Sequence, residues 1–317
     1  RNTVAEVYEQ IEKDLLKGIQ LMEENTMEFY FNRLNAAAGY ALLTRMYVYM
    51  GDWDNVVRYA NKVLKMRPEL LNLSKQQVNP WSSFSVYVDV CPTEILWGMS
   101  WDAENSYNTW GDVAPYTPSN DLIAVFQQDV DRGVVDIRGD WKNNLNAYLK
   151  GGDMKVWASG GMRSMCTWGD KGRMSSLAYN GGIRTGEMYI SRAEAYCQKY
   201  LKSGNTSDAE KALEDLNTLR YNRFYEGYVE KKMSDFASAE ELLSFCWRER
   251  RRELCGEGNH RWFDLKRQGM PEIKHVFVDN TTGEGTTYTL MKEDKRYLLP
   301  IPRKEIDRCP TLKQNQY

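Results

Sequence analysis

Residues 247–254 read WRERRREL, residues 257–258 read EG and residues 261–267 read RWFDLKR. This stretch gathers acidic and basic side chains into one short segment. Glu249 and Glu253 lie four residues apart, and Arg261 and Asp264 lie three apart, which are the spacings at which side chains meet on one face of a helix. Helical ion pairs therefore explain the spacing better than a catalytic site does. We predict a structural network made of these side chains: Glu249, Arg252, Glu253, Arg261 and Asp264.

Helical periodicity continues upstream of this segment. Apolar residues recur at three- and four-residue intervals in several windows, the pattern of amphipathic helices. We predict helices over residues 3–24, 33–50, 52–65, 187–201, 207–224 and 238–255. Thr3 is a cap for the first helix, Gly51 ends the second, Asp52 caps the third and Pro68 stops it. The tight turn at Gly51 predicts a helical hairpin of tetratricopeptide (TPR) type.

A loop-rich insert separates two helical parts. Between residues 72 and 185 the helical period fades and Gly, Asn, Ser and Pro accumulate, with a strand-like segment only near residues 94–99. We predict a mainly α fold: TPR-like helices over 1–71, an irregular insert with a candidate ligand surface over 72–185, and TPR-like helices again over 186–317. A helical scaffold of this kind gives an irregular insert rigid support.

The composition excludes several classes of protein. The 42 basic and 44 acidic side chains give a formal charge of −2, which provides no global field to attract nucleic acid. No apolar run reaches the ~20 residues of a membrane helix. Residues 1–15 lack the apolar core of a signal peptide, so we expect that any export signal or lipid anchor has been removed and that an amino-terminal portion is absent from this chain.

Metal, cofactor and catalytic motifs receive no support from the residue spacing. His260 and His275 stand in no metal-binding motif, and the six cysteines form no C-x-x-C pair. The glycine pairs lack the G-x-S-x-G and P-loop patterns. We expect no cofactor and no metal site, although calcium binding and the disulfide state of the cysteines stay open. With 44 acids in the chain, a glycosidase-like carboxylate pair can be imagined anywhere and carries no information.

The carboxy-terminal third resembles the SusD/RagB family. Residues 247–267 follow that family's pattern ER-x-x-EL-x-x-EG-x-R-x-x-DL-x-R, and further segments agree in the family's order. These are MYISRAEA at 188–195, LNTLR at 216–220, LPIP at 299–302 and the closing QNQY at 314–317. The middle segment at 118–138 and the hairpin at 51–53 also look like their family counterparts, so the resemblance covers nearly the whole chain. The front departs from it, because family members carry a lipidated cysteine and further helices.

The resemblance implies a function as well as a SusD-like fold. It implies a non-catalytic receptor of a Bacteroidetes-type outer membrane, lipid-anchored and facing outward, that captures oligosaccharide and passes it to a SusC-type TonB-dependent transporter. Two alternatives remain open at this point. One is a glycoside hydrolase, and the other is a TPR-type scaffold that binds a protein or peptide.

Aromatic residues concentrate in the insert. Seven of the ten Trp lie between residues 72 and 185, about a third of the chain. A sugar ring can stack its flat C–H face on an aromatic ring, while its hydroxyl groups need amide or carboxylate partners. Trp97 lies in an apolar run and is assigned to the core. The candidate ligand-binding residues are Trp101, Asp102, Asn105, Tyr107, Trp110 and Tyr116, with Trp81 as a weaker candidate.

Overall fold

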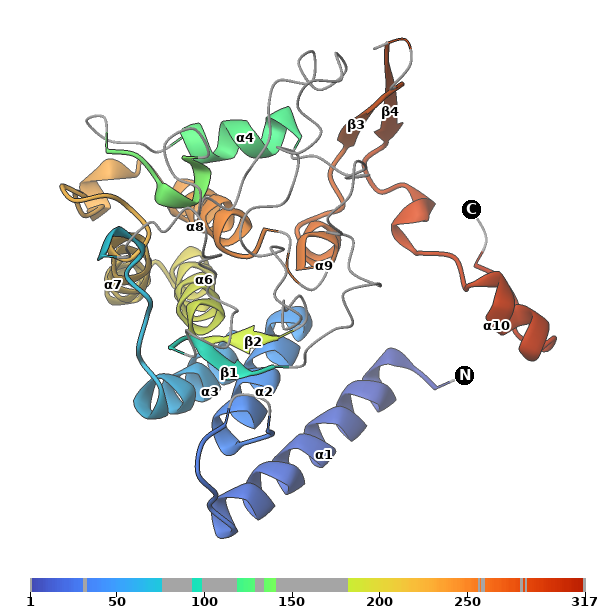
Figure 1. Cartoon of the computed structure of the whole chain (residues 1–317), viewed down its shortest axis with the longest axis horizontal. Helices are drawn as coiled ribbons and strands as arrows, with labels where there is room; N and C mark the ends of the chain where they lie inside the picture. The colour runs from blue at the N-terminus through green and yellow to red at the C-terminus, as the bar shows by residue number, and fades with distance from the viewer. Residues whose placement is uncertain are drawn as a thin grey trace, which may run out of the picture. The chain divides into compact units, whose positions relative to one another are not determined.

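The structure is a computed structural model of residues 1–317. It describes residues 2–30, 33–75, 93–98, 119–128, 134–140, 182–255, 257, 260–279, 282 and 284–315. The chain divides into two compact units, and the second contains residue 259 onward. Within the described residues the fold is mainly helical, as the sequence predicts (Figure 1).

Helices form the framework of the first unit. They are α1 (Val4–Glu24), α2 (Ala36–Met50), α3 (Trp53–Met66), α4 (Asn120–Gln127), α6 (Thr185–Ser203), α7 (Thr206–Tyr221) and α8 (Ala239–Glu253). Helix α2 packs against α1 and α3, while α6 packs against α3, α7 and α8. Helix α6 is therefore the central element that joins the early helices to the late ones.

The predicted caps are present at the helix ends. The Thr3 side chain accepts a hydrogen bond from the Glu6 backbone N–H, and Glu6 reaches back to complete a capping box. Gly51 has φ 73° and ends α2 in the left-handed conformation that glycine adopts most easily. Asp52 then accepts from Asn55 N–H and caps α3. The antiparallel α2–α3 hairpin expected from the sequence is thus confirmed.

Two clusters of buried apolar side chains hold these helices together. The first lies between α1, α2, α3 and α6 and contains Leu43, Val56 and Met188. Its small residues Ala38 and Ala41 are fully buried, which lets α2 approach its neighbours closely. The second cluster lies between α6, α7 and α8. Trp97, assigned to the core from the sequence, is partly buried against the first cluster.

Short elements connect the described parts of the insert to the helices. Strand β1 (Ile95–Trp97) pairs antiparallel with β2 (Ile183–Arg184), immediately before α6. Three-residue 3₁₀ turns occur at η1 (Leu73–Lys75), η3 (Ile137–Gly139) and η5 (Met233–Asp235). Asp136, just before η3, forms a β-bridge with Phe224, which follows α7. The described ends of the insert are therefore attached to the scaffold.

The second unit has its own small set of elements. It contains α9 (His260–Arg267), strands β3 (Ile273–Val278) and β4 (Gly285–Leu290), η6 (Lys295–Tyr297) and α10 (Arg303–Arg308). Strands β3 and β4 form an antiparallel hairpin in regular register, which the sequence analysis does not predict. Trp262 stacks on Tyr297, whose hydroxyl donates to Pro271 O at 2.5 Å. Among the described helices, none is long and apolar enough to cross a bilayer.

Candidate functional site

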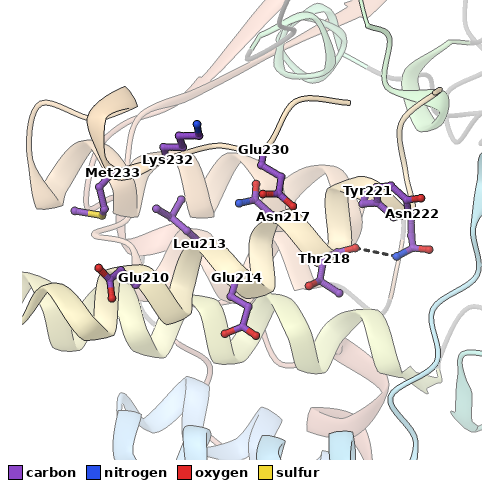
Figure 2. Close-up of a pocket in the computed structure, with 10 residues that line it drawn as sticks. All are labelled: Glu210, Leu213, Glu214, Asn217, Thr218, Tyr221, Asn222, Glu230, Lys232 and Met233. Carbon is purple, nitrogen blue, oxygen red and sulfur yellow. Dashed lines mark hydrogen bonds between the residues drawn. The ribbon is translucent and has the colours of Figure 1, made fainter. Parts of the chain in front are cut away.

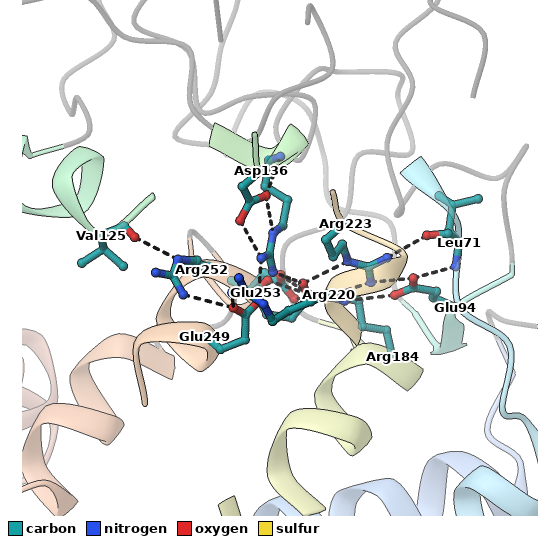
Figure 3. A network of polar contacts seen from close by, with 12 residues as sticks. Leu71, Glu94, Val125, Asp136, Arg184, Arg220, Arg223, Glu249, Arg252 and Glu253 are labelled. Carbon is teal, nitrogen blue, oxygen red and sulfur yellow. Dashed lines mark hydrogen bonds and ion pairs between the residues drawn. The ribbon is translucent and has the colours of Figure 1, made fainter. Parts of the chain in front are cut away.

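The most highly charged part of the first unit is completely buried. Within the described residues, five arginines and five acids form one continuous network around the carboxy-terminal end of α8 (Figure 3). The arginines are Arg138, Arg184, Arg220, Arg223 and Arg252, and the acids are Glu94, Asp136, Glu249, Glu253 and Glu257. The formal charges balance, as burial at this depth requires.

Glu253 is the hub of the network. Its Oε2 accepts from Arg138 Nη1 at 2.8 Å and from Arg223 Nε at 3.0 Å. Its Oε1 accepts from Arg223 Nη2 at 2.9 Å and also from Arg184 Nη1. Each carboxylate oxygen of Glu253 thus accepts two hydrogen bonds from guanidinium N–H groups. Gly186 makes room for this arrangement, because a Cβ on it would lie 2.6 Å from Glu253 Oε1.

Glu249, one turn earlier on α8, is bound by three arginines. Its Oε1 accepts from Arg138 Nη2 at 2.5 Å, and its Oε2 accepts from Arg220 Nη1 at 2.7 Å and from Arg252 Nη1 at 3.0 Å. Burial alone would raise the pKa of Glu249, but the guanidinium groups of Arg138, Arg220 and Arg252 outweigh it and lower the pKa to about 2. Burial also opposes ionisation of Glu253, yet Arg184, Arg223 and Arg138 hold its pKa well below the usual range.

The network extends to the ends of the insert. Glu94, just before β1, accepts from Arg223 Nη2 at 2.6 Å, from Arg184 Nη1 at 3.0 Å and from Leu71 N–H at 2.8 Å. Asp136 holds Arg138 through two bonds of 2.9 and 2.7 Å. Glu94 and Asp136 therefore fix two points of the insert to α8 through shared arginines.

Helix α4 is held by a further arginine of the network. Arg252 donates from Nε to Val125 O at 2.9 Å and from Nη2 to Gln128 O at 3.0 Å. Backbone carbonyl groups at a helix end have no partner within the helix, and these two gain one here. Arg252 thus ties the carboxy-terminal end of α4 directly to α8.

The arrangement of these charged side chains favours a structural role over a catalytic one. Glu249 and Glu253 are 0% exposed and stay ionised, so neither has a proton to give or a path to a substrate. Among the described residues no group of three or more His, Cys, Asp or Glu side chains is placed to hold a metal ion. Cys197 and Cys246 are buried free thiols, Cys255 is buried and Cys309 is exposed, while Cys91 and Cys166 lie outside the described residues.

The predicted network residues fall into two groups in the structure. Glu249, Arg252 and Glu253 lie together in the buried network, where Arg252 and Glu249 form an ion pair three residues apart on α8. Asp264 lies in the second unit, where it is buried and pairs with Arg267 at 2.7 Å, whereas Arg261 is exposed. The spacing of Arg261 and Asp264 fits a helix, and Arg267, one turn after Asp264, forms an ion pair with it.

Most partners in the network come from far along the sequence. Arg138 is 115 residues from Glu253, Arg184 is 69 away and Arg223 is 30 away. Short-range spacing could not have found them. Each of these arginines lies in a separate segment, for example Arg220 in LNTLR at 216–220, and no spacing in the sequence relates them to Glu253.

The predicted ligand residues lie outside the described residues. This holds for Trp81 and for the loop residues Trp101, Asp102, Asn105, Tyr107, Trp110 and Tyr116. The described elements on either side of the loop are β1 and α4. Glu94 ties the approach to β1 into the network, and Arg252 does the same for α4. The described elements that flank the loop, β1 and α4, are thus both attached to one buried set of charges.

Comparison with known families identifies the chain. The sequence profile of the SusD family matches residues 143–317, more than half of the protein. The chain belongs to the SusD family. A second profile, described as "Starch-binding associating with outer membrane", matches residues 1–48. No curated protein matches the chain.

Solved structures of SusD-like proteins share the fold. A SusD-like protein from Bacteroides fragilis is 20% identical, with 99% of this chain and 71% of that chain covered and a TM-score of 0.64. A SusD-like carbohydrate binding protein from Bacteroides vulgatus is also 20% identical. The match covers 96% of this chain and 64% of that chain, with a TM-score of 0.63. A SusD superfamily protein from Bacteroides thetaiotaomicron is 23% identical. The match covers 100% of this chain and 67% of that chain, with a TM-score of 0.61. The chain therefore spans about two thirds of the length of these SusD-family structures.

Proposed function

We propose that this protein is a non-catalytic glycan receptor at the cell surface. It captures oligosaccharide or polysaccharide and delivers it to a partner TonB-dependent transporter of SusC type. Membership of the SusD family carries this proposal, together with the family description of starch binding at the outer membrane. In the full-length protein a lipid anchor holds the receptor on the outward-facing surface of the outer membrane.

The burial of Glu249 and Glu253 in the network supports a receptor that binds glycan without cleaving it. The acids of the family motif that attract a catalytic interpretation, Glu249 and Glu253, are each occupied by at least three arginine contacts and have no exposed surface. A glycosidase needs one protonated and one ionised carboxyl group facing the bond it breaks. These two acids meet neither requirement, so they favour a structural role.

Binding and turnover can be tested in one experiment. Purified protein should be retarded in a native gel that contains a soluble neutral polysaccharide, because a receptor binds its ligand reversibly. Incubation with the same polysaccharide should release no reducing ends above a heat-inactivated control. Sustained release of reducing ends that scales with protein concentration would establish an enzyme instead.

The candidate ligand loop is tested by removing its rings. If Trp101 and Trp110 are stacking platforms, Trp101→Ala or Trp110→Ala should weaken glycan binding by ~1–3 kcal/mol, roughly 5- to 150-fold, in a calorimetric titration. The melting temperature should stay close to that of the parent protein. A loss of ~3–5 kcal/mol of stability in the same variants would place the rings in the core, because a large cavity would remain.

A further inference from the structure

An open groove runs along α7, between this helix and the segment that follows it. It has a volume of about 730 Å³, within the ~300–1,000 Å³ range of small-molecule sites. Figure 2 shows α7 side chains on one side and the segment that follows the helix on the other. The lining residues are Glu210, Leu213, Glu214, Asn217, Thr218, Tyr221, Asn222, Glu230, Lys232 and Met233. All of them belong to the first unit.

Asn217 fixes the two walls of the groove relative to each other. Its Nδ2 donates to Lys231 O at 2.9 Å, and its Oδ1 accepts from Lys231 N–H at 2.9 Å and from the Tyr228 hydroxyl at 2.8 Å. One amide side chain on α7 thus holds the facing segment at a set distance. A site that is formed before the ligand arrives loses less conformational entropy on binding.

The groove offers an aromatic face beside hydrogen-bonding groups. Tyr221, at the carboxy-terminal end of α7, is 60% exposed. Next to it, the Asn222 amide is oriented by a 2.9 Å bond from Nδ2 to Thr218 O, with its own oxygen able to accept from a hydroxyl group. Glu214 lies two turns before Tyr221 on the same face of the helix. Stacking on a ring combined with amide and carboxylate acceptors is the combination that a sugar ring requires.

The charge of the groove restricts its ligand. Three carboxylates, Glu210, Glu214 and Glu230, line it together with one lysine, Lys232. This excess of negative charge disfavours acidic polysaccharides and nucleic acid. Neutral hydroxyl groups can instead donate to the carboxylates.

A peptide ligand fits the groove less well. Addition of an extended peptide to a wall needs free backbone N–H and C=O groups, and both groups of Lys231 are already bonded to Asn217. A helical peptide needs a row of apolar anchors. The groove supplies only Leu213 and Met233 for that purpose.

We propose that the α7 groove is a saccharide-binding subsite for neutral glycans, separate from the aromatic loop at residues 101–116. The inference rests on the proposed function, since it assigns an additional site to a glycan receptor. In this subsite Tyr221 stacks on a pyranose ring, while Glu214, Glu230 and Asn222 bind its hydroxyl groups. The carboxylates direct the groove towards uncharged sugars.

Affinity electrophoresis with a panel of neutral polysaccharides tests this subsite. The panel consists of soluble starch, dextran, xylan and galactomannan, and the polymer that retards the parent protein is used for the variants. Tyr221→Ala should weaken its binding by about 5- to 70-fold, the effect of losing ~80–100 Å² of stacked area in part or in full. Tyr221→Phe, which keeps the ring, should stay within about twofold of the parent protein.

Tyr288→Ala is the matched control. Tyr288 is 62% exposed, nearly the same as Tyr221, but it lies on β4 in the second unit. Its removal should leave binding unchanged. Melting curves of both alanine variants should coincide with that of the parent protein, because an exposed ring contributes little to stability.

The possible outcomes separate this inference from the proposed function. If a polysaccharide retards the parent protein and Tyr221→Ala binds as tightly as Tyr288→Ala, the groove is not a subsite while the receptor function stands. If neither a polymer of the panel nor polygalacturonate retards the parent protein, both proposals fall. Tyr221-dependent binding of polygalacturonate would overturn the neutral-glycan assignment. Tyr221-dependent binding of an oligolysine peptide, without an effect on polysaccharide, would identify the groove as a peptide site.

Discussion

At the residue scale, Glu249 shows most directly how much one side chain of the network contributes to stability. Glu249→Gln leaves Arg138, Arg220 and Arg252 without their shared carboxylate in a region that excludes water. Breaking a buried ion pair from one side typically costs ~3–5 kcal/mol, so we expect a loss of that size in the free energy of unfolding. Chemical denaturation monitored by circular dichroism measures it.

Glu240→Gln provides the control on the same helix. Glu240 is exposed in the first turn of α8, where its interaction with the helix dipole and its exposed hydrogen bonds to Ser238 and to its own backbone N–H together contribute little to stability. Equal effects of the two substitutions would show that the network contributes no more than surface charge does.

At the residue scale, the sequence analysis predicted the network residues that lie on α8, namely Glu249, Arg252 and Glu253, but not those that come from other segments. Glu249 and Glu253 were visible because they recur at a helical interval. Their partners Arg138, Arg184 and Arg223 come from η3, β2 and the end of α7. No local rule relates those segments, since only the tertiary fold brings them together.

At the element scale, the close contact between α6 and α8 depends on Gly186. A methyl group there would meet Glu253 Oε1 at 2.6 Å and Glu94 Oε2 at 3.2 Å, as well as the Arg184 guanidinium. Gly186→Ala should therefore lower the free energy of unfolding by ~2–4 kcal/mol, through overpacking and displaced ion pairs. Thermal and urea unfolding curves measure the change.

Gly18→Ala is the matched substitution in α1. Gly18 lies inside a helix with nothing within 4 Å of the added Cβ. Alanine should stabilise that helix by about 0.5–1 kcal/mol. If both variants became more stable, the space at Gly186 would not be limiting.

The elements differ in how well the sequence predicts them. The helices from α1 to α8 that the periodicity indicated are present because caps such as Thr3, Gly51 and Asp52 act locally. The β3–β4 hairpin was missed, since six-residue strands with mixed polar and apolar faces give a weak alternating signal. The predicted ligand loop at 101–116 stays a prediction.

At the scale of the whole molecule, stability should depend on pH in two opposing ways. The pKa values of Glu249 and Glu253 are lower in the folded protein than in the unfolded chain. Their contribution to the free energy of unfolding is therefore complete above the unfolded value of about 4.3 and is lost as the pH falls towards about 2. Burial raises the pKa of Asp215 to about 6, although Arg192 opposes the shift. The contribution of Asp215 to the free energy of unfolding is therefore present below about pH 4 and is lost as the pH rises through about 6.

The melting temperature should therefore rise as the pH falls from about 7 to about 5 and then decrease steeply below about 4. Asp215→Asn should remove the first change and leave the second, which scanning calorimetry across this range can resolve. A melting temperature of the parent protein that stays constant down to pH 3 would contradict the role assigned to the two glutamates.

The balanced charges around Glu253 also determine when the protein can fold during synthesis. A growing chain that has reached residue 223 already contains Arg138, Arg184, Arg220 and Arg223, but of their carboxylate partners within the described residues it contains only Glu94 and Asp136. Closing this centre early would bury unpaired positive charge, at a cost of several kcal/mol for each ion. We therefore expect the charged centre of the first unit to close only after α8 and Glu257 have been synthesised.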